Sequence, residues 1–134
     1  MNVLSWNVRG AGKINFVATL KSFITLYNPV IIAILEPRIS GDRADVVSRK
    51  LGFYGICRAD PMGFSGGGWV LWKGDVANVE ILYASPYAIH ALIRENGEPS
   101  WVLSFIYASK NEKIRDCFLE CLNTFYKDTF FHRC

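Results

Sequence analysis

Two short apolar segments, each ending in a polar side chain, constrain the fold of this chain most strongly. Residues 2–7 end in Asn7, and the wholly apolar run at residues 30–35 is followed by Glu36. A helix-length segment separates them, and a strand, a helix and a second strand in this order place two parallel strands near each other. Asn7 and Glu36 should therefore emerge at one edge of a sheet, where open α/β sheets bind ligands.

A carboxylate beside an amide oxygen predicts a divalent cation site at this edge. Mg²⁺ takes oxygen ligands and keeps several waters, so a small number of protein oxygens is enough. Each residue also has an ordinary structural explanation. Glu36 could be a solvated carboxylate at the end of a strand, and Asn7 could be a turn-forming asparagine.

The segment between the two strands has the period of a helix. Its apolar residues recur at steps of three and four and form one face, namely Phe16, Val17, Leu20, Phe23, Ile24 and Tyr27. Asn28-Pro29 should end this helix, because the residue before a proline avoids helical geometry. For the same reason we expect Pro37 to hold Glu36 in an extended backbone conformation.

The rest of the chain predicts further strands, with a helix before them and a helix after them. A short helix should follow Ser40 and end at Gly52, and a capping-box sequence at Ser109 should begin the last helix. The expected strands are 53–57, 69–73, 78–84, 87–94 and 101–107. A length of 134 residues fits one domain.

The glycines at 66–68 do not form a phosphate-binding loop. Gly63 and Gly68 have the spacing of that motif, but Trp69 stands where its lysine should be. The order of strand, glycines and helix that the motif requires is also absent from the pattern. We therefore expect these glycines to lead into a strand.

Charge and cysteine content narrow the class of protein only a little. A net charge of +3 permits a polyanionic partner without demanding one. The four cysteines include no Cys-x-x-Cys pair, so reduced thiols and an intracellular location, compatible with the nucleus, are expected. No apolar run approaches the roughly 20 residues of a membrane span, so no membrane partner is expected.

Three sequence motifs occur in a fixed order: Leu4–Gly10, Leu35–Arg38 and Ile106–Ser109. Together they resemble the endonuclease/exonuclease/phosphatase superfamily. The glycines at 63–67, followed by Trp69 and Trp72-Lys73, are similar to the N-terminal endonuclease of plant non-LTR (LINE-type) retrotransposons. The resemblance extends from residue 1 to about residue 110.

The resemblance implies a two-sheet α/β sandwich that cleaves phosphodiesters in DNA at its strand tips, with Mg²⁺ or Mn²⁺. Glu36 would ligate the metal, Asn7 would help to hold the metal or the attacking water, and Tyr107 would contact the scissile phosphate. Arg9, Trp69 and Lys73 are the predicted nucleic-acid contacts, although core packing is the more common use of a tryptophan in such a strand. Lys110 stands where the family commonly has a proline.

The sequence lacks two segments that the resemblance would supply, a Gly-Asp-x-Asn strand and an Asp-His pair. In the family they provide the general base and the catalytic imidazole. We therefore expect residues 1–127 to form a partial domain, the N-terminal portion of the sandwich, followed by a divergent tail at 128–134. One face of the first sheet would lack its cover, which would favour self-association through that face.

Three functions remain open at this point. The first is a metal-dependent DNA endonuclease by descent, inactive or weakly active. The second is a non-catalytic remnant that binds nucleic acid or protein, and the third is a phosphatase for small phosphate esters. The remaining acids and histidines offer no replacement base: we expect Asp116 and Asp128 at the surface, His90 as an ordinary strand residue, and His132 without a partner.

Overall fold

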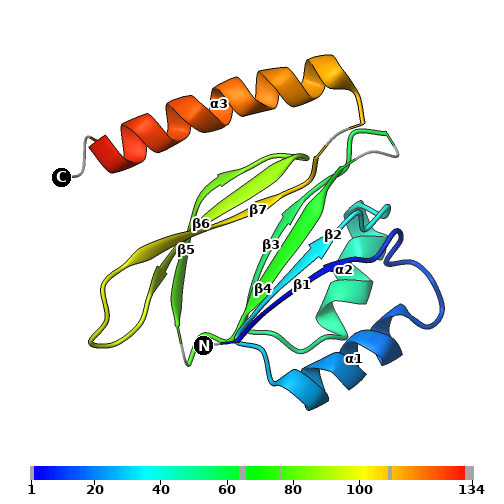
Figure 1. Ribbon diagram of the computed structural model, residues 1–134. Helices are drawn as coiled ribbons and strands as arrows, with labels where there is room; N and C mark the ends of the chain where they lie inside the picture. Colours follow the sequence, from blue (N-terminus) through cyan, green and yellow to red (C-terminus); the bar gives the residue numbers. More distant parts are fainter. Residues whose placement is uncertain (1, 64–65, 76, 109, 132–134) are drawn as a thin grey trace.

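The computed structural model describes residues 2–63, 66–75, 77–108 and 110–131, with side chains described as far as residue 124. Figure 1 shows two sheets packed face to face, with helices on the outside. The elements in chain order are β1 (Val3–Asn7), α1 (Phe16–Tyr27), β2 (Ile31–Leu35), α2 (Gly41–Arg49), β3 (Gly55–Ala59), β4 (Gly68–Trp72), β5 (Asn78–Ala84), β6 (Ala88–Arg94), β7 (Trp101–Ile106) and α3 (Glu112–Phe131). The predicted α/β class and the two-sheet arrangement are confirmed.

The first sheet has the strand order β1-β2-β4-β3. β1 and β2 are parallel, with Val3 opposite Ile31 and Asn7 opposite Leu35. The predicted strand, helix and strand unit is therefore present, and both strands end at the same edge. β2 lies between β1 and β4 and is buried along almost its whole length, as its unbroken apolar run predicted.

Each face of the first sheet is covered by a different layer. On one face Ile32, Ile34 and Leu71 pack with Phe16 and Leu20 of α1. On the other face the first sheet packs against a second sheet, with the order β5-β6-β7. The expectation of an uncovered face on the first sheet is wrong, because three antiparallel strands are enough to cover it, and it gives no support to self-association there.

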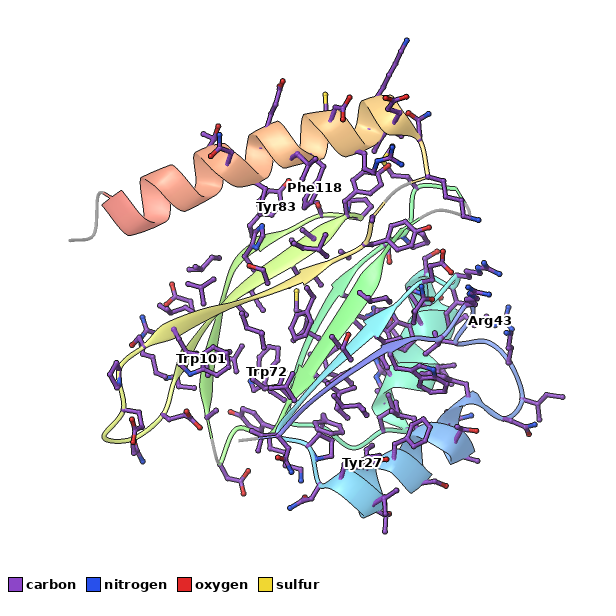
Figure 2. All side chains as sticks on the ribbon, in the orientation of Figure 1. Tyr27, Arg43, Trp72, Tyr83, Trp101 and Phe118 are labelled. Atoms are coloured by element: carbon purple, nitrogen blue, oxygen red, sulfur yellow. The ribbon has the colours of Figure 1, made fainter. Side chains whose placement is uncertain are left out.

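The helix α3 lies across the outer face of the second sheet (Figure 1). It leaves a groove of about 530 Å³, lined by α3 residues such as Cys117 and Phe118 and by Tyr83 of β5. Figure 2 shows Tyr83 and Phe118 near each other between the sheet and the helix. α3 is therefore packed less closely than α1, whose Phe16 and Leu20 are buried in the core.

The start of α3 differs from the prediction. Asn111 precedes the first helical residue, and its side-chain oxygen accepts a hydrogen bond from the Ile114 N–H at 3.2 Å, which is the geometry of an N-cap. Ser109, the predicted cap, lies outside the described residues. α3 continues to Phe131, so the predicted division at residue 128 falls inside a helix, and the tail as a separate unit stays a prediction.

The glycines before β4 have a packing role. Gly66 and Gly67 have φ angles of +74° and +80°, and a Cβ on Gly67 would lie within 3.1 Å of the Pro61 backbone. Gly68 begins β4, so no helix follows these glycines and the rejection of a phosphate-binding loop is confirmed. Among the described residues, no helix is both long enough and apolar enough to cross a membrane.

Candidate active site at the strand tips

The loops after β1 and β2 run side by side beyond the ends of the strands. The N–H of Val8 donates to the Leu35 carbonyl at 3.0 Å, that of Gly10 to the Glu36 carbonyl at 2.8 Å, and that of Ala11 to Pro37 at 2.7 Å. These bonds continue the parallel pairing of the two strands. They fix the backbone on both sides of the predicted site.

The edge formed by these two loops, at residues 8–11 and 36–38, is called the rim. It holds three of the four described non-glycine residues with positive φ. Arg9, Glu36 and Arg38 have φ angles of +49°, +55° and +56°. Such geometry costs about 1–3 kcal/mol per residue and is found where surrounding structure enforces it, often at functional sites. The expectation that Pro37 keeps Glu36 extended is therefore wrong, because the backbone bonds between the two loops override the local preference.

Glu36 is buried at the rim, with an exposed fraction of 8%. The Tyr107 hydroxyl donates a hydrogen bond to its Oε1 at 2.7 Å. Arg38 Nη2 donates to the other oxygen, Oε2, at 3.4 Å and forms an ion pair with it. The carboxylate is thus held by one short contact and one long contact, and it is not an ordinary solvated residue at a strand end.

Tyr107 reaches Glu36 from the second sheet. It follows the last residue of β7, and its N–H donates to the Tyr87 carbonyl at 2.8 Å, directly before β6 begins. The site therefore joins the two sheets at their common edge. Residues that are 71 positions apart in the sequence meet there.

Asn7 lies at the same edge as Glu36, since it ends β1 opposite Leu35. Paired residues of parallel strands share a face of the sheet, and Leu35 packs in the core between the two sheets. Asn7 is exposed. The predicted placement of the two strand ends at one edge is confirmed, while the metal-binding role of either side chain stays a prediction.

The predicted nucleic-acid contacts do not share one location. Arg9 is exposed at the rim. Trp69 is 1% exposed and packs edge-on against Phe16 at 6.2 Å, so its prediction as a nucleic-acid contact is wrong: the ring belongs to the core. The prediction for Lys73 is also wrong. Lys73 follows Trp72 at the end of the sheet opposite to Glu36, where its Nζ donates a hydrogen bond to Asn28 Oδ1 at 2.6 Å.

Sequence reasoning gave no role to a second basic residue at the rim, Arg38. It also overlooked Lys13 and Arg43, which flank the loop after β1: a Cβ on Gly10 would lie 3.5 Å from Lys13, and Arg43 donates to the Gly12 carbonyl at 3.2 Å. Figure 2 shows Arg43 beside this loop. The sequence signal that could have identified these basic residues is the occurrence of glycines and basic residues soon after two strands that end at the same edge.

The histidine in the second sheet contacts other residues than those of the rim. His90 is 2% exposed, lies 2.7 Å from the Ser104 hydroxyl through its Nδ1, and stacks on Tyr83. Burial lowers the pKa of His90, so its neutral form is favoured. It is an ordinary strand residue, as predicted, and its burial is a finding of the structure, while His132 lies outside the described residues and Asp116 is exposed on α3.

The acidic groups of the site are few. Among the described residues no three histidine, cysteine, aspartate or glutamate side chains gather as a metal cluster. Glu36 is thus the carboxylate that a cation at this rim would use. A single carboxylate fits Mg²⁺, which is commonly held by one or two carboxylates together with waters and substrate phosphates.

Comparison with known structures defines the fold as DNase-like. No protein-family model and no curated protein matches the sequence. Among solved structures, TDP2 from D. rerio, complexed with a single-stranded DNA product, superposes with a TM-score of 0.62 at 16% identity, covering 95% of this chain and 53% of that one. TDP2 from C. elegans matches at 0.56 and 15%, covering 94% and 42%.

A truncated TDP2 from Caenorhabditis elegans gives a similar result, with a TM-score of 0.55 at 15% identity, covering 93% of this chain and 54% of that one. The chain therefore spans about half the length of the solved structures that it matches. At this level of identity the likeness establishes the fold.

Proposed function

We propose that this chain carries the N-terminal part of a metal-dependent phosphodiesterase domain that acts on DNA, of the endonuclease type found in LINE-type retrotransposons. The observation that supports this most directly is the hydrogen bond between Tyr107 and Glu36 at 2.7 Å. It brings together two of the three ordered motifs at the edge where the third motif also ends. The fold shared with TDP2, of which one example is complexed with DNA, supports DNA as the substrate.

Glu36 would be the direct ligand of Mg²⁺ or Mn²⁺, and the amide oxygen of Asn7 would assist it or orient a bound water. When bound, the cation supplies positive charge that stabilises the negative charge developing on the phosphoryl oxygens. The surrounding side chains position the carboxylate. The Tyr107 hydroxyl fixes the orientation of Glu36, and burial at 8% exposure limits its other conformations.

Tyr107 and Arg9 would act on the substrate. Tyr107 lies beside Glu36, within reach of a phosphate bound there; because its hydroxyl carries one proton, a hydrogen bond donated to the phosphate would replace the one to Glu36. Arg9 is exposed on the adjoining loop, where a guanidinium would contact the polynucleotide backbone. The glycine and tryptophan sequence similar to retrotransposon endonucleases favours this substrate over a small phosphate ester.

The 134-residue polypeptide should have little activity on its own. It contains no Gly-Asp-x-Asn segment and no Asp-His pair, the segments that the family resemblance assigns to the general base and the catalytic imidazole. Phosphoryl transfer depends on a positioned water and on charge stabilisation as well as on the metal. We expect weak nicking of supercoiled DNA or none.

A second candidate is a nucleic-acid-binding module without catalysis. Arg9, Lys13 and Arg43 lie around the rim, and none of them forms an ion pair within the part of the chain that the structure describes. Basic side chains outside ion pairs, beside a single carboxylate, can bind the phosphate backbone of a nucleic acid whether or not cleavage follows. DNA binding that is independent of Glu36 and unaccompanied by nicking would favour this alternative.

The test combines two assays on the wild-type polypeptide and on Glu36→Gln, which keeps the shape of the side chain and removes its charge. Titration with Mn²⁺, followed through tryptophan fluorescence, should give saturable binding in the wild type and none in the variant. Incubation with supercoiled plasmid and Mg²⁺ should give little nicked product. An identical titration for both proteins would refute the metal site, and robust nicking that disappears in Glu36→Gln would refute the expected inactivity.

A further inference from the structure

We propose that Arg38 competes with the divalent cation for Glu36, and that metal binding redirects its guanidinium to the substrate phosphate. Arg38 neutralises the carboxylate while the site holds no cation. A cation at Glu36 would repel the guanidinium, and an arriving phosphate would attract it. This inference depends on the proposed metal site and adds to it a means of coupling metal binding to substrate binding.

The two contacts of Glu36 differ in a way that identifies the exchangeable one. The Tyr107 hydroxyl lies 2.7 Å from Oε1, whereas Arg38 Nη2 lies 3.4 Å from Oε2. Charged N–H to carboxylate bonds are normally about 2.7–2.9 Å long. Oε2 is therefore loosely held, and it is the oxygen that a cation can take with the least loss of existing interactions.

The surroundings of Arg38 allow its side chain to move without disturbing the core. Its side chain is 45% exposed, compared with 11% for that of Glu36. Its stem passes beside the bare backbone of Gly10: a Cβ there would lie 4.0 Å from Arg38 Cδ and 3.5 Å from Lys13 Cε. Release of the ion pair thus needs side-chain rotation alone, and the nearby Lys13 adds positive charge that also attracts phosphate.

The backbone keeps Arg38 near the site throughout. Glu36 and Arg38 both have positive φ, and the backbone bonds from Gly10 to Glu36 and from Ala11 to Pro37 fix the segment between them. The guanidinium therefore stays within reach of any phosphate bound at Glu36. This arrangement makes metal and polynucleotide reinforce each other, since each of them favours the rotated side chain, and such coupling is reciprocal.

The first experiment compares Arg38→Gln with Arg94→Gln, which also removes an arginine from an ion pair. Arg94 pairs with Glu80 at the opposite end of β6 from Tyr87, and its side chain is 46% exposed, close to the value for Arg38. The dissociation constant for Mn²⁺ is measured without DNA by tryptophan fluorescence. Arg38→Gln should tighten binding about fivefold or more, and Arg94→Gln should match the wild type.

The second experiment measures the coupling. A single-stranded phosphorothioate oligonucleotide should strengthen Mn²⁺ binding to the wild type and should do so much less in Arg38→Gln. Arg38→Ala gives the same comparison if circular dichroism shows that Arg38→Gln does not fold. Wild-type binding with equal or weaker affinity in the Arg38 variants would overturn the competition alone. Absence of binding in the wild type and in the Arg38 variants would overturn it together with the proposed metal site.

Discussion

The two sheets of this protein differ in how completely they are enclosed. In the first sheet β2 and β4 are buried from both sides, with α1 and α2 on one face and the second sheet on the other. The second sheet shares that inner core, in which Trp72 and Trp101 lie between the sheets (Figure 2), but its outer face meets α3 across a groove of about 530 Å³. The enclosed sheet fixes the position of Glu36, and the second sheet contributes Tyr107.

The difference in enclosure explains how a carboxylate on a strained backbone can be held in place. Glu36 follows a strand with no freedom to shift, because Ile31 to Ile34 are all 0% exposed. The second sheet needs only to keep β7 in register with β6 for Tyr107 to reach Glu36. The outer helix takes no part in this geometry, so we expect its packing to matter least.

The comparison predicts its largest effect for matched leucine truncations. Leu71→Ala, at a fully buried position of β4, should lower the free energy of unfolding by about 2–5 kcal/mol, because it leaves a cavity in a core that cannot collapse. Leu122→Ala, in a smaller pocket between α3 and the second sheet that Tyr83 and His90 also line, should lower it by about 1 kcal/mol or less. Urea denaturation measures both, and equal losses would show that α3 is as firmly packed as the first sheet.

A smaller effect is expected at the junction of the two sheets. Tyr107→Phe removes the hydrogen bond to the buried Glu36 carboxylate and should lower the free energy of unfolding by about 1.5 kcal/mol. Tyr87→Phe is the matched control, since among the described residues its hydroxyl makes only a 3.9 Å contact, with the sulfur of Met62. A loss in Tyr87→Phe as large as that in Tyr107→Phe would mean that the Glu36 contact is not a significant link between the sheets.

The smallest expected effect is the pH dependence contributed by the second sheet. Burial lowers the pKa of His90 below its usual 6.5 in the folded state, so the unfolded chain binds a proton that the folded chain excludes. Stability from this group is complete above pH 6.5 and is lost as pH falls through the lowered folded value. Thermal melts between pH 5 and 7.5 should therefore show a slope that His90→Gln reduces. The same slope in His90→Gln would refute the assignment.

Several elements could be predicted because their signals are local. The helical period from Phe16 to Tyr27, the stop at Asn28-Pro29 and the unbroken apolar run of β2 each follow from short-range sequence pattern. The parallel pairing of β1 and β2 followed from connection rules, and it placed Asn7 and Glu36 at one edge. The ordered motifs then suggested Tyr107 as a third member of the site.

Other features could not be predicted, because distant parts of the chain decide them. The local pattern around Trp69 was compatible with a nucleic-acid contact and with core packing, and the contact with Phe16, 53 residues away in the chain, places it in the core. Glu36 adopts positive φ against the local preference set by Pro37, because backbone bonds to the β1 loop require it. The ion pair with Arg38 follows from that same backbone geometry.

The sequence by itself determined which segments become strands and helices, and at which edge the polar side chains of the first two strands emerge. Periodicity and connection length are properties of neighbouring residues, so they are visible in one dimension. The tertiary structure alone decided that Tyr107 holds Glu36 and that a second sheet covers the first. Those outcomes depend on contacts between residues far apart in the chain, and a local pattern carries no information about which surfaces will meet.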